Sequence, residues 1–139
     1  MTTAPGLFDP DIDRTPLLRL MRRPAADKLF VILFTARSGS SWLTDIARAS
    51  GRLSYPDECF NPGFLPTMSR ALSSATMADY IAALTRRRNT QGVYGCQLTY
   101  HHLRAAFHDE AEFLSYFRGA AFFWLMREDF VLQAVSLYK

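Results

Sequence analysis

The sequence lacks any long apolar run. No stretch approaches the roughly 20 residues that a membrane-spanning helix needs, and the run at residues 29–34 has the length of a strand. The stretch at residues 17–21 is interrupted by Arg19 and has no small-residue cleavage site, so it does not resemble a signal peptide. We therefore expect neither a transmembrane segment nor a secretory signal.

Cysteine is also scarce. The chain has two cysteines, Cys59 and Cys96, and their spacing forms neither a CxxC motif nor a zinc-binding pattern. Two such residues are too few for a disulfide framework. We expect two reduced thiols in a cytoplasmic protein.

No strong charge of one sign is present. Sixteen basic and thirteen acidic side chains give a net charge of +3, with no dense basic stripe. This argues against nucleic acid as a partner and slightly favours a small anionic ligand. Hydrophobic residues make up 49% of the 139 residues, which excludes wholesale disorder and suffices for one domain.

The pattern of apolar residues predicts an α/β fold. Continuous apolar runs typical of buried parallel strands alternate with segments of helical periodicity, so we expect a parallel sheet flanked by helices. The first 27 residues contain four of the seven prolines and are expected to form a loosely attached arm, with a short helix capped by Thr15. The expected buried strands are 28–35, 92–99 and 119–126, and 52–66 is expected to be irregular. The expected helices are 42–50, ended by Gly51, 77–88, capped by Thr76, 103–118 and 129–138.

A turn of small residues at 36–41 follows the first predicted strand and precedes a helix. Backbone N–H groups of such a turn and of the helix N-terminus can converge on an anion, normally a phosphate. Arg37 can add a bidentate contact, and Ser38, Ser40 and Ser41 can add hydroxyl donors. The turn has one glycine and no lysine, so it is not a Walker A loop. A plain turn with a serine cap is the alternative.

A second candidate group lies near the end of the sequence. Arg127 follows the third predicted strand, and Ser136 lies about two turns into the next helix. Ligands of open parallel sheets bind at the carboxyl ends of strands, so Arg127 is expected at the same edge as the turn at 36–41. Taken alone, Arg127 would be a surface arginine and Ser136 a solvated serine.

Together these segments resemble sulfotransferases that use 3′-phosphoadenosine 5′-phosphosulfate (PAPS), in particular bacterial carbohydrate sulfotransferases of the trehalose 2-sulfotransferase type. The pairing of the first and last segments is more specific than either alone. The resemblance implies a P-loop-like, sulfotransferase-type sheet and a PAPS-binding domain over residues 28–139, with residues 1–27 as an N-terminal arm. The matching segments are ARSGSSWL at 36–43, YPDECF at 55–60, YGCQLTYHH at 94–102 and REDFVLQAVSLY at 127–138.

The resemblance implies a role for each candidate residue. Arg127 and Ser136 would hold the 3′-phosphate of PAPS. Glu58 would be the catalytic base, if burial beside aromatics such as Tyr55 and Phe60 raises its pKa. The 5′-phosphosulfate loop would comprise Arg37, Ser38, Gly39, Ser40 and Ser41, with Trp42 just behind it.

Two neighbouring histidines offer an alternative base. His101 and His102 follow the second predicted strand, and histidine titrates near neutral pH. Contact with the acceptor by Tyr100 or His101 is the favoured interpretation of this segment. The resembled family carries a lysine and a Trp-Asn pair where this chain has Gln97 and Tyr100-His101, so the resemblance does not imply trehalose as the acceptor.

These observations predict a sulfotransferase that moves a sulfuryl group from PAPS to a hydroxyl of a carbohydrate or glycolipid, without a metal. The resembled enzymes continue beyond the final motif, so we expect a chain truncated there. A fragment, a chain completed by a partner or a homo-oligomer, and a degenerate relative remain open. The rival functions are a non-catalytic nucleotide-binding module and a kinase-like phosphotransferase, which the missing loop lysine disfavours.

Overall fold

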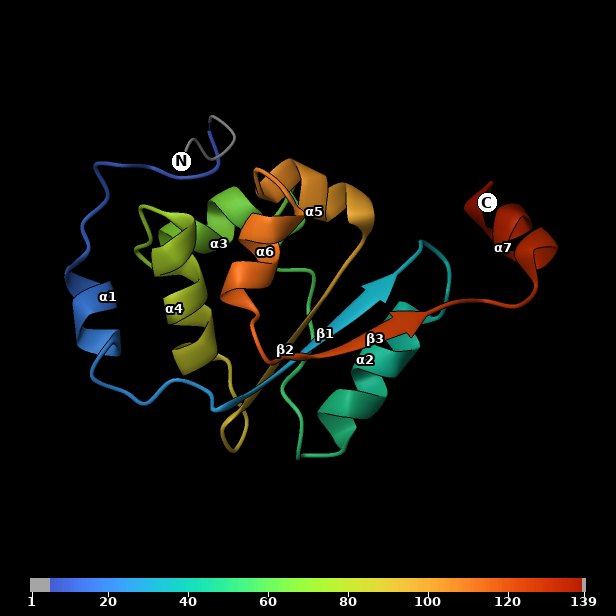
Figure 1. The fold of residues 1–139 in the computed structure, drawn as a ribbon, viewed down its shortest axis with the longest axis horizontal. Helices are drawn as coiled ribbons and strands as arrows, with labels where there is room; N and C mark the ends of the chain where they lie inside the picture. The colour runs from blue at the N-terminus through green and yellow to red at the C-terminus, as the bar shows by residue number, and fades with distance from the viewer. Residues whose placement is uncertain (1–5, 139) are drawn as a thin grey trace.

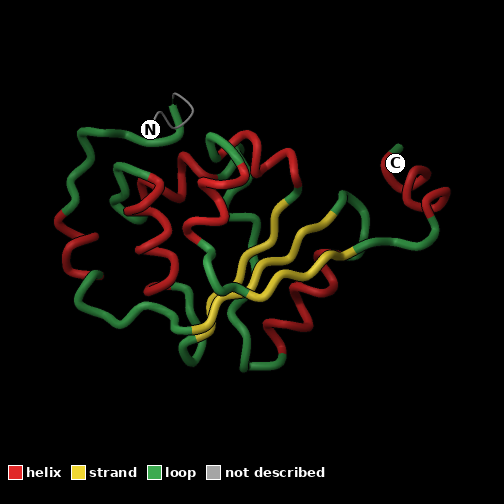
Figure 2. The backbone as a smooth tube through the Cα atoms, in the orientation of Figure 1, coloured by secondary structure: helices red, strands yellow, loops and turns green. Residues whose placement is uncertain are grey.

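The computed structural model describes residues 6–138, in which three parallel strands form one sheet (Figures 1 and 2). Strand β1 (Lys28–Phe34) lies in the centre, between β2 (Val93–Leu98) and β3 (Ala121–Leu125). Val31 of β1 is in register with Cys96 on one side and Phe122 on the other. The predicted α/β fold with a parallel sheet is confirmed.

Helices lie on both faces of this sheet. Helix α2 (Ser40–Ala49) lies on one face, and a group of helices covers the other (Figure 1). The segment after β3 leads away from the sheet to α7 (Phe130–Leu137) at the far end of the molecule. The covering group consists of α3 (Leu65–Ala71), α4 (Met77–Arg87), α5 (Tyr100–Ala106) and α6 (Glu110–Tyr116), and α1 (Thr15–Leu20) packs against α4.

The alternation of side chains along β1 explains why both of its faces are apolar. Val31 belongs to the core beneath α3 to α6, whereas Phe30 and Ile32 face the side of α2. Gly95 of β2 lies against the Phe30 ring, and a Cβ atom at this position would overlap that ring. A glycine is therefore required in the middle of β2.

The outer edge of β2 is covered by the loop that follows α2. The backbone N–H of Gly95 donates to Ser54 Oγ at 2.7 Å, and that of Gln97 donates to the Asp57 carbonyl at 3.1 Å. These contacts satisfy backbone donors that an open edge strand would expose. The loop is thereby held beside the carboxyl end of β2, where Glu58 follows.

The third strand is not buried, although residues 119–126 were expected to be. Phe122, Phe123 and Trp124 are exposed, Trp124 by 71% of its surface. Strand β3 lies at an edge of the sheet as β2 does, but no loop among residues 6–138 bonds its outer edge in the way that the loop after α2 bonds that of β2. Helix α7 is also largely exposed over its apolar residues, which include Phe130 and Val131.

The helices differ from the prediction at two further places. The single helix expected over 103–118 is two helices, because Phe107 is extended and the Asp109 side chain caps α6 by accepting the N–H of Glu112 at 2.8 Å. Helix α3 was not predicted, and the segment expected to be irregular, 52–66, overlaps it only at Leu65 and Pro66. Pro66 lies in the first turn of α3, where its missing N–H costs no hydrogen bond.

The N-terminal arm is attached more firmly than expected. Leu17 is 2% exposed and belongs to the core, and Arg14 forms a 2.6 Å ion pair with Asp79 of α4. Thr15 does not cap α1: Arg14 holds the N-cap position, and the Thr15 N–H donates to Asp13 at 2.9 Å. Residues 1–5 of the predicted arm lie outside the described residues.

Other helix ends follow the sequence. Thr76 caps α4 by accepting the N–H of Asp79 at 3.1 Å, and Gly51 follows α2 with a φ of 65°. No helix among the described residues is long and apolar enough to cross a membrane. Cys59 and Cys96 are both free thiols and both buried.

Candidate functional site

The turn between β1 and α2 has an unusual backbone. Arg37 has a φ of 62°, which is rare for a residue with a side chain, and Gly39 at the N-cap of α2 has a φ of 91°. No side chain caps α2, so the serine cap expected in the alternative of a plain turn is absent. Free N–H groups at the start of a ten-residue helix and a strained arginine beside them are features of an anion-binding turn.

A glutamine of α7 holds this turn. Gln133 donates from Nε2 to Thr35 Oγ1 at 3.0 Å and to the Ala36 carbonyl at 2.7 Å, and is 9% exposed. Helix α7 is itself started by Asp129, which accepts the N–H of Leu132 at 2.9 Å. Sequence reasoning missed Gln133. The available signal was a single amide within an otherwise apolar helical run at 130–135.

The two separate sequence groups meet at the same edge of the sheet. Arg37 Nε donates to Ser136 Oγ at 2.8 Å, across 99 residues of chain. Arg127 Nη1 lies 3.4 Å from the Arg37 carbonyl. The predicted proximity of Arg127 to the turn at 36–41 is therefore confirmed, and Ser136 points back to that turn from α7.

These residues line a polar pocket of about 550 Å³, a volume typical of small-ligand sites. We call it the polar pocket. Ser38 is not among its lining residues: its hydroxyl is buried and has no hydrogen-bond partner among the described residues. The polar pocket is lined by Phe34, Ala36, Arg37, Gly39, Ser40, Ser41, Trp42, Glu58, Thr99, His102, Arg127 and Ser136.

Glu58 enters the polar pocket from the loop after α2. Its Oε2 accepts a hydrogen bond from Asn61 at 3.1 Å and lies 4.0 Å from Nε2 of His102. The side chain of Glu58 is 31% exposed, so it can reach a ligand. Asn61 itself accepts the N–H of Gly63 at 2.9 Å, which fixes the amide that orients Glu58.

The aromatic neighbours expected around Glu58 are only partly present. Phe60 is fully buried and packs against Tyr80 and Phe107 in the core. Tyr55 lines a smaller cavity of about 220 Å³ together with Glu58, and its ring lies 5.9 Å from the guanidinium carbon of Arg48. Asn61 and His102, rather than Phe60, flank the carboxylate.

His102 is the histidine that reaches the polar pocket. The backbone N–H of Thr99 is directed at His102 Nδ1 at 3.4 Å, in a reciprocal cap at the start of α5. Nδ1 is therefore the acceptor, which places the proton of the neutral ring on Nε2, facing Glu58. Burial lowers the pKa of His102 below its usual value of 6.5, although Glu58 acts in the opposite direction.

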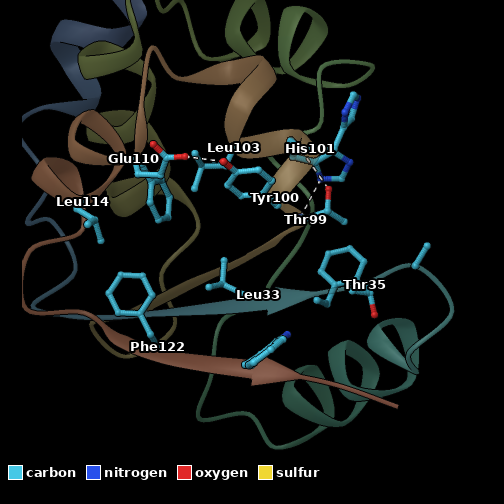
Figure 3. A pocket seen from close by; sticks show the side chains of 14 residues that line it. Leu33, Thr35, Thr99, Tyr100, His101, Leu103, Glu110, Leu114 and Phe122 are labelled. Atoms are coloured by element: carbon cyan, nitrogen blue, oxygen red, sulfur yellow. Dashed lines mark hydrogen bonds between the residues drawn. The ribbon is translucent and has the colours of Figure 1, made fainter. Parts of the chain in front are cut away.

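Tyr100 and His101 line a different cavity. This second cavity, which we call the apolar cavity, measures about 920 Å³ and lies between the sheet and helices α5 and α6 (Figure 3). The Tyr100 hydroxyl donates to Glu110 at 2.7 Å. The two predicted acceptor-binding residues are thus separated from most of the predicted PAPS-binding residues, and Phe34, Ala36, Thr99 and His102 line both cavities.

Comparisons with known proteins identify no relative of this chain. No family model, no curated protein and no solved structure matches the sequence or its fold.

Proposed function

We propose that this protein is a sulfotransferase that binds PAPS in the polar pocket and sulfates a hydroxyl of a carbohydrate or glycolipid. The observation that carries the proposal is the 2.8 Å contact of Arg37 with Ser136 beside Arg127. In this proposal the sheet is the P-loop-like sheet of the sulfotransferase type. Its three strands and their parallel order are compatible with that assignment.

The donor groups of the polar pocket suit a ligand with two phosphate-type groups. Arg37 and Arg127 supply two cations, and the first turn of α2 supplies backbone N–H groups and the Ser40 and Ser41 hydroxyls. A Cβ added at Gly39 would meet no atom within 4 Å, so space is open beside the turn. The buried Ser38 hydroxyl does not line the polar pocket, so it adds no donor to this set.

Each phosphate-type group has its own residues in the proposal. Arg37 with the serines of the turn would hold the 5′-phosphosulfate, and Arg127 with Ser136 the 3′-phosphate. Arg37 already contacts Ser136, so the two positions are adjacent and one ligand can span them. Trp42, exposed by 72% of its surface, adds an aromatic face to the same pocket.

The chemistry assigned to the chain is positioning, charge neutralisation and removal of one proton. PAPS supplies a sulfuryl group, whose bond to the 5′-phosphate breaks, with its electron pair on phosphate, as the acceptor oxygen bonds to sulfur. Glu58 accepts the proton that the acceptor hydroxyl loses. Arg37 neutralises the charge that builds on the phosphate.

Glu58 suits the role of base better than either histidine does. His102 Nε2 carries its proton in the assigned tautomer and so faces the pocket as a donor. His101 is exposed and lines the apolar cavity without lining the polar pocket. Glu58 combines a free approach from the polar pocket with orientation by Asn61.

A thermal unfolding experiment with 3′,5′-adenosine bisphosphate, AMP and ATP tests this proposal. Ligand at about 100 times its dissociation constant adds roughly 2.7 kcal/mol to the free energy of unfolding. We expect the bisphosphate to raise the melting temperature more than AMP or ATP does, because Arg127 and Ser136 contact its 3′-phosphate.

A matched pair of variants sharpens the experiment. Arg127→Ala is expected to remove the preference for the bisphosphate over AMP, whereas Arg48→Ala, which removes the same charge outside the polar pocket, is expected to retain it. Equal stabilisation by bisphosphate and AMP in the unsubstituted protein would contradict the assignment of a 3′-phosphate site.

A further inference from the structure

The apolar cavity has the size of a small-molecule site and a mostly hydrocarbon wall. Its volume of about 920 Å³ lies within the range of sites that enclose drug-sized ligands. Figure 3 shows Leu33, Leu114 and Phe122 directed into the space between the sheet and the helices. Phe113 and Trp124 complete the apolar wall.

The polar groups at the edge of the apolar cavity are paired with one another. The Tyr100 hydroxyl donates to Glu110 Oε1 at 2.7 Å, and Arg104 Nη1 lies 3.3 Å from the same oxygen. Thr99 Oγ1 accepts the His102 N–H at 3.2 Å. The first three of these groups are exposed to solvent, Tyr100 by 65% of its surface and the Arg104 and Glu110 side chains by about half, so they lie at the edge and leave the wall itself mostly hydrocarbon. The cavity therefore suits an apolar group.

The apolar cavity is continuous with the polar pocket. Phe34, Ala36, Thr99 and His102 line both. His102 lies 4.0 Å from Glu58, which lines the polar pocket and not the apolar cavity. A molecule whose body fills the apolar cavity can therefore place one end at His102 and Glu58.

We propose that the acceptor is an amphiphile: its apolar chain occupies the apolar cavity, and its hydroxyl-bearing head lies at the wall shared with the polar pocket. This inference rests on the proposed sulfotransferase function and selects the glycolipid class over the free sugar. The sulfated hydroxyl is then at the head, beside Glu58, and the chain supplies binding free energy without taking part in proton transfer.

The two tryptophans of the sequence provide separate reporters for the two cavities. Trp124 lines the apolar cavity, and Trp42 lines the polar pocket. Both are more than two-thirds exposed, so phenylalanine at either position leaves the core intact. Trp42→Phe therefore leaves a fluorophore at the apolar cavity, and Trp124→Phe leaves one at the polar pocket.

The experiment titrates each variant with n-octyl glucoside below its critical micelle concentration and with methyl glucoside, which has the same sugar. Each buried methylene adds about fourfold in affinity, so octyl glucoside is expected to bind at least about 100-fold more tightly than methyl glucoside if half the chain is buried. We expect a blue shift of Trp124 emission in Trp42→Phe. Equal affinity for the two glucosides, or no change in emission, would overturn the proposal.

The same variants separate this inference from the proposed function. 3′,5′-Adenosine bisphosphate is titrated into Trp124→Phe, where Trp42 reports the polar pocket. Bisphosphate binding without octyl glucoside binding overturns the amphiphile and keeps the sulfotransferase. Octyl glucoside binding without bisphosphate binding overturns the donor assignment, and with it the role of the amphiphile as acceptor.

A blocking variant and its control locate the binding. Leu114→Glu places a carboxylate in the wall of the apolar cavity at a position 51% exposed, and Leu18→Glu makes the same change on α1 at a position 61% exposed. We expect octyl glucoside binding to weaken at least tenfold in Leu114→Glu and to persist in Leu18→Glu. Sedimentation shows whether a second copy of this chain occupies the cavity instead. A dimer that dissociates in Leu114→Glu, but not on addition of octyl glucoside, would overturn the proposal.

Discussion

The polar pocket and the apolar cavity share a wall, yet they are built from different parts of the strands. The polar pocket is formed where strands end: Arg37 follows β1, and Arg127 follows β3. The apolar cavity is formed by strand and helix faces, including Phe122 and Trp124 of the same β3. One strand therefore contributes to both cavities, its end to one and its face to the other.

This difference shows how a small parallel sheet separates charge from apolar surface. Residues after a strand's carboxyl end lie in turns, where backbone N–H groups are free and arginines stay hydrated. Residues within a strand alternate between faces, so Phe122 and Trp124 of β3 line the apolar cavity, whereas Ala121 and Phe123 lie on the opposite face of the sheet. Substitutions that act on one cavity and spare the other test this separation.

The largest expected effect is on turnover at the polar pocket. Glu58→Gln is expected to lower sulfuryl transfer by about 10² to 10⁴, the usual contribution of general base catalysis, because the amide cannot accept the acceptor's proton. Steady-state rates with PAPS measure this. Affinity for 3′,5′-adenosine bisphosphate is expected to hold. Asp45→Asn, an exposed position on α2, is the matched control, and unchanged turnover in Glu58→Gln would remove Glu58 from the mechanism.

The next largest expected effect is on the free energy of unfolding, and it differs between the buried and the exposed residues that line the apolar cavity. Phe113 is 2% exposed and packs against Phe107 and Phe117, so Phe113→Ala is expected to lower the free energy of unfolding by about 3–5 kcal/mol. Trp124→Ala, on the exposed side of the same cavity, is expected to cost about 0.5 kcal/mol or less. Urea denaturation measures both, and equal losses would show that β3 is covered in solution.

A substitution in the polar pocket is expected to weaken nucleotide binding and to leave binding in the apolar cavity unchanged. Arg37→Ala is expected to weaken 3′,5′-adenosine bisphosphate about 10- to 100-fold, because hydrogen bonds to a charged group are lost. Octyl glucoside affinity is expected to stay the same, since Arg37 does not line the apolar cavity. Calorimetric titration measures both, with Arg48→Ala as the control. A parallel loss for both ligands would show that the cavities do not bind independently.

The smallest effect is a pH dependence at the wall that the cavities share. Burial lowers the pKa of His102 in the folded chain, so the unfolded chain binds more protons below about pH 6.5. Stability is therefore present above that pH and is lost as the pH falls through the lowered pKa. His102→Gln keeps a residue suited to the cap of α5 and is expected to reduce this loss. The measurement is the difference in urea midpoint between pH 7.5 and pH 5. The same difference in His102→Gln as in the unsubstituted protein would show that His102 is not its source.

Local sequence rules predicted much of the fold. The runs at β1, β2 and β3 are continuous and apolar, and the caps at Thr76 and Gly51 follow directly from residue type. The break between α5 and α6 was missed because Asp109 can either start a helix or lie within one, and packing of Phe107 in the core selects the first.

The candidate site was predictable to the extent that it lies at strand ends. Arg37 and Arg127 were expected at one edge of the sheet, and Glu58 was named only through the family resemblance; all three line one pocket. Tyr100 was expected at the acceptor, yet its hydroxyl is bound to Glu110. A hydrogen bond between residues ten positions apart depends on how α6 packs against α5, which residue spacing does not specify.

The sequence by itself determined the order of strands and helices, the parallel sheet and the charged turn after β1. These depend on local chemistry: apolar periodicity, capping side chains and the backbone freedom of Gly39. Only the three-dimensional packing joined Ser136 to Arg37, placed Gln133 beneath the turn and left β3 exposed at the sheet edge. The first two outcomes depend on contacts between residues 99 and 97 positions apart, which form only when the sheet and α7 come together. The exposure of β3 depends on which segments cover the sheet, which local sequence does not specify.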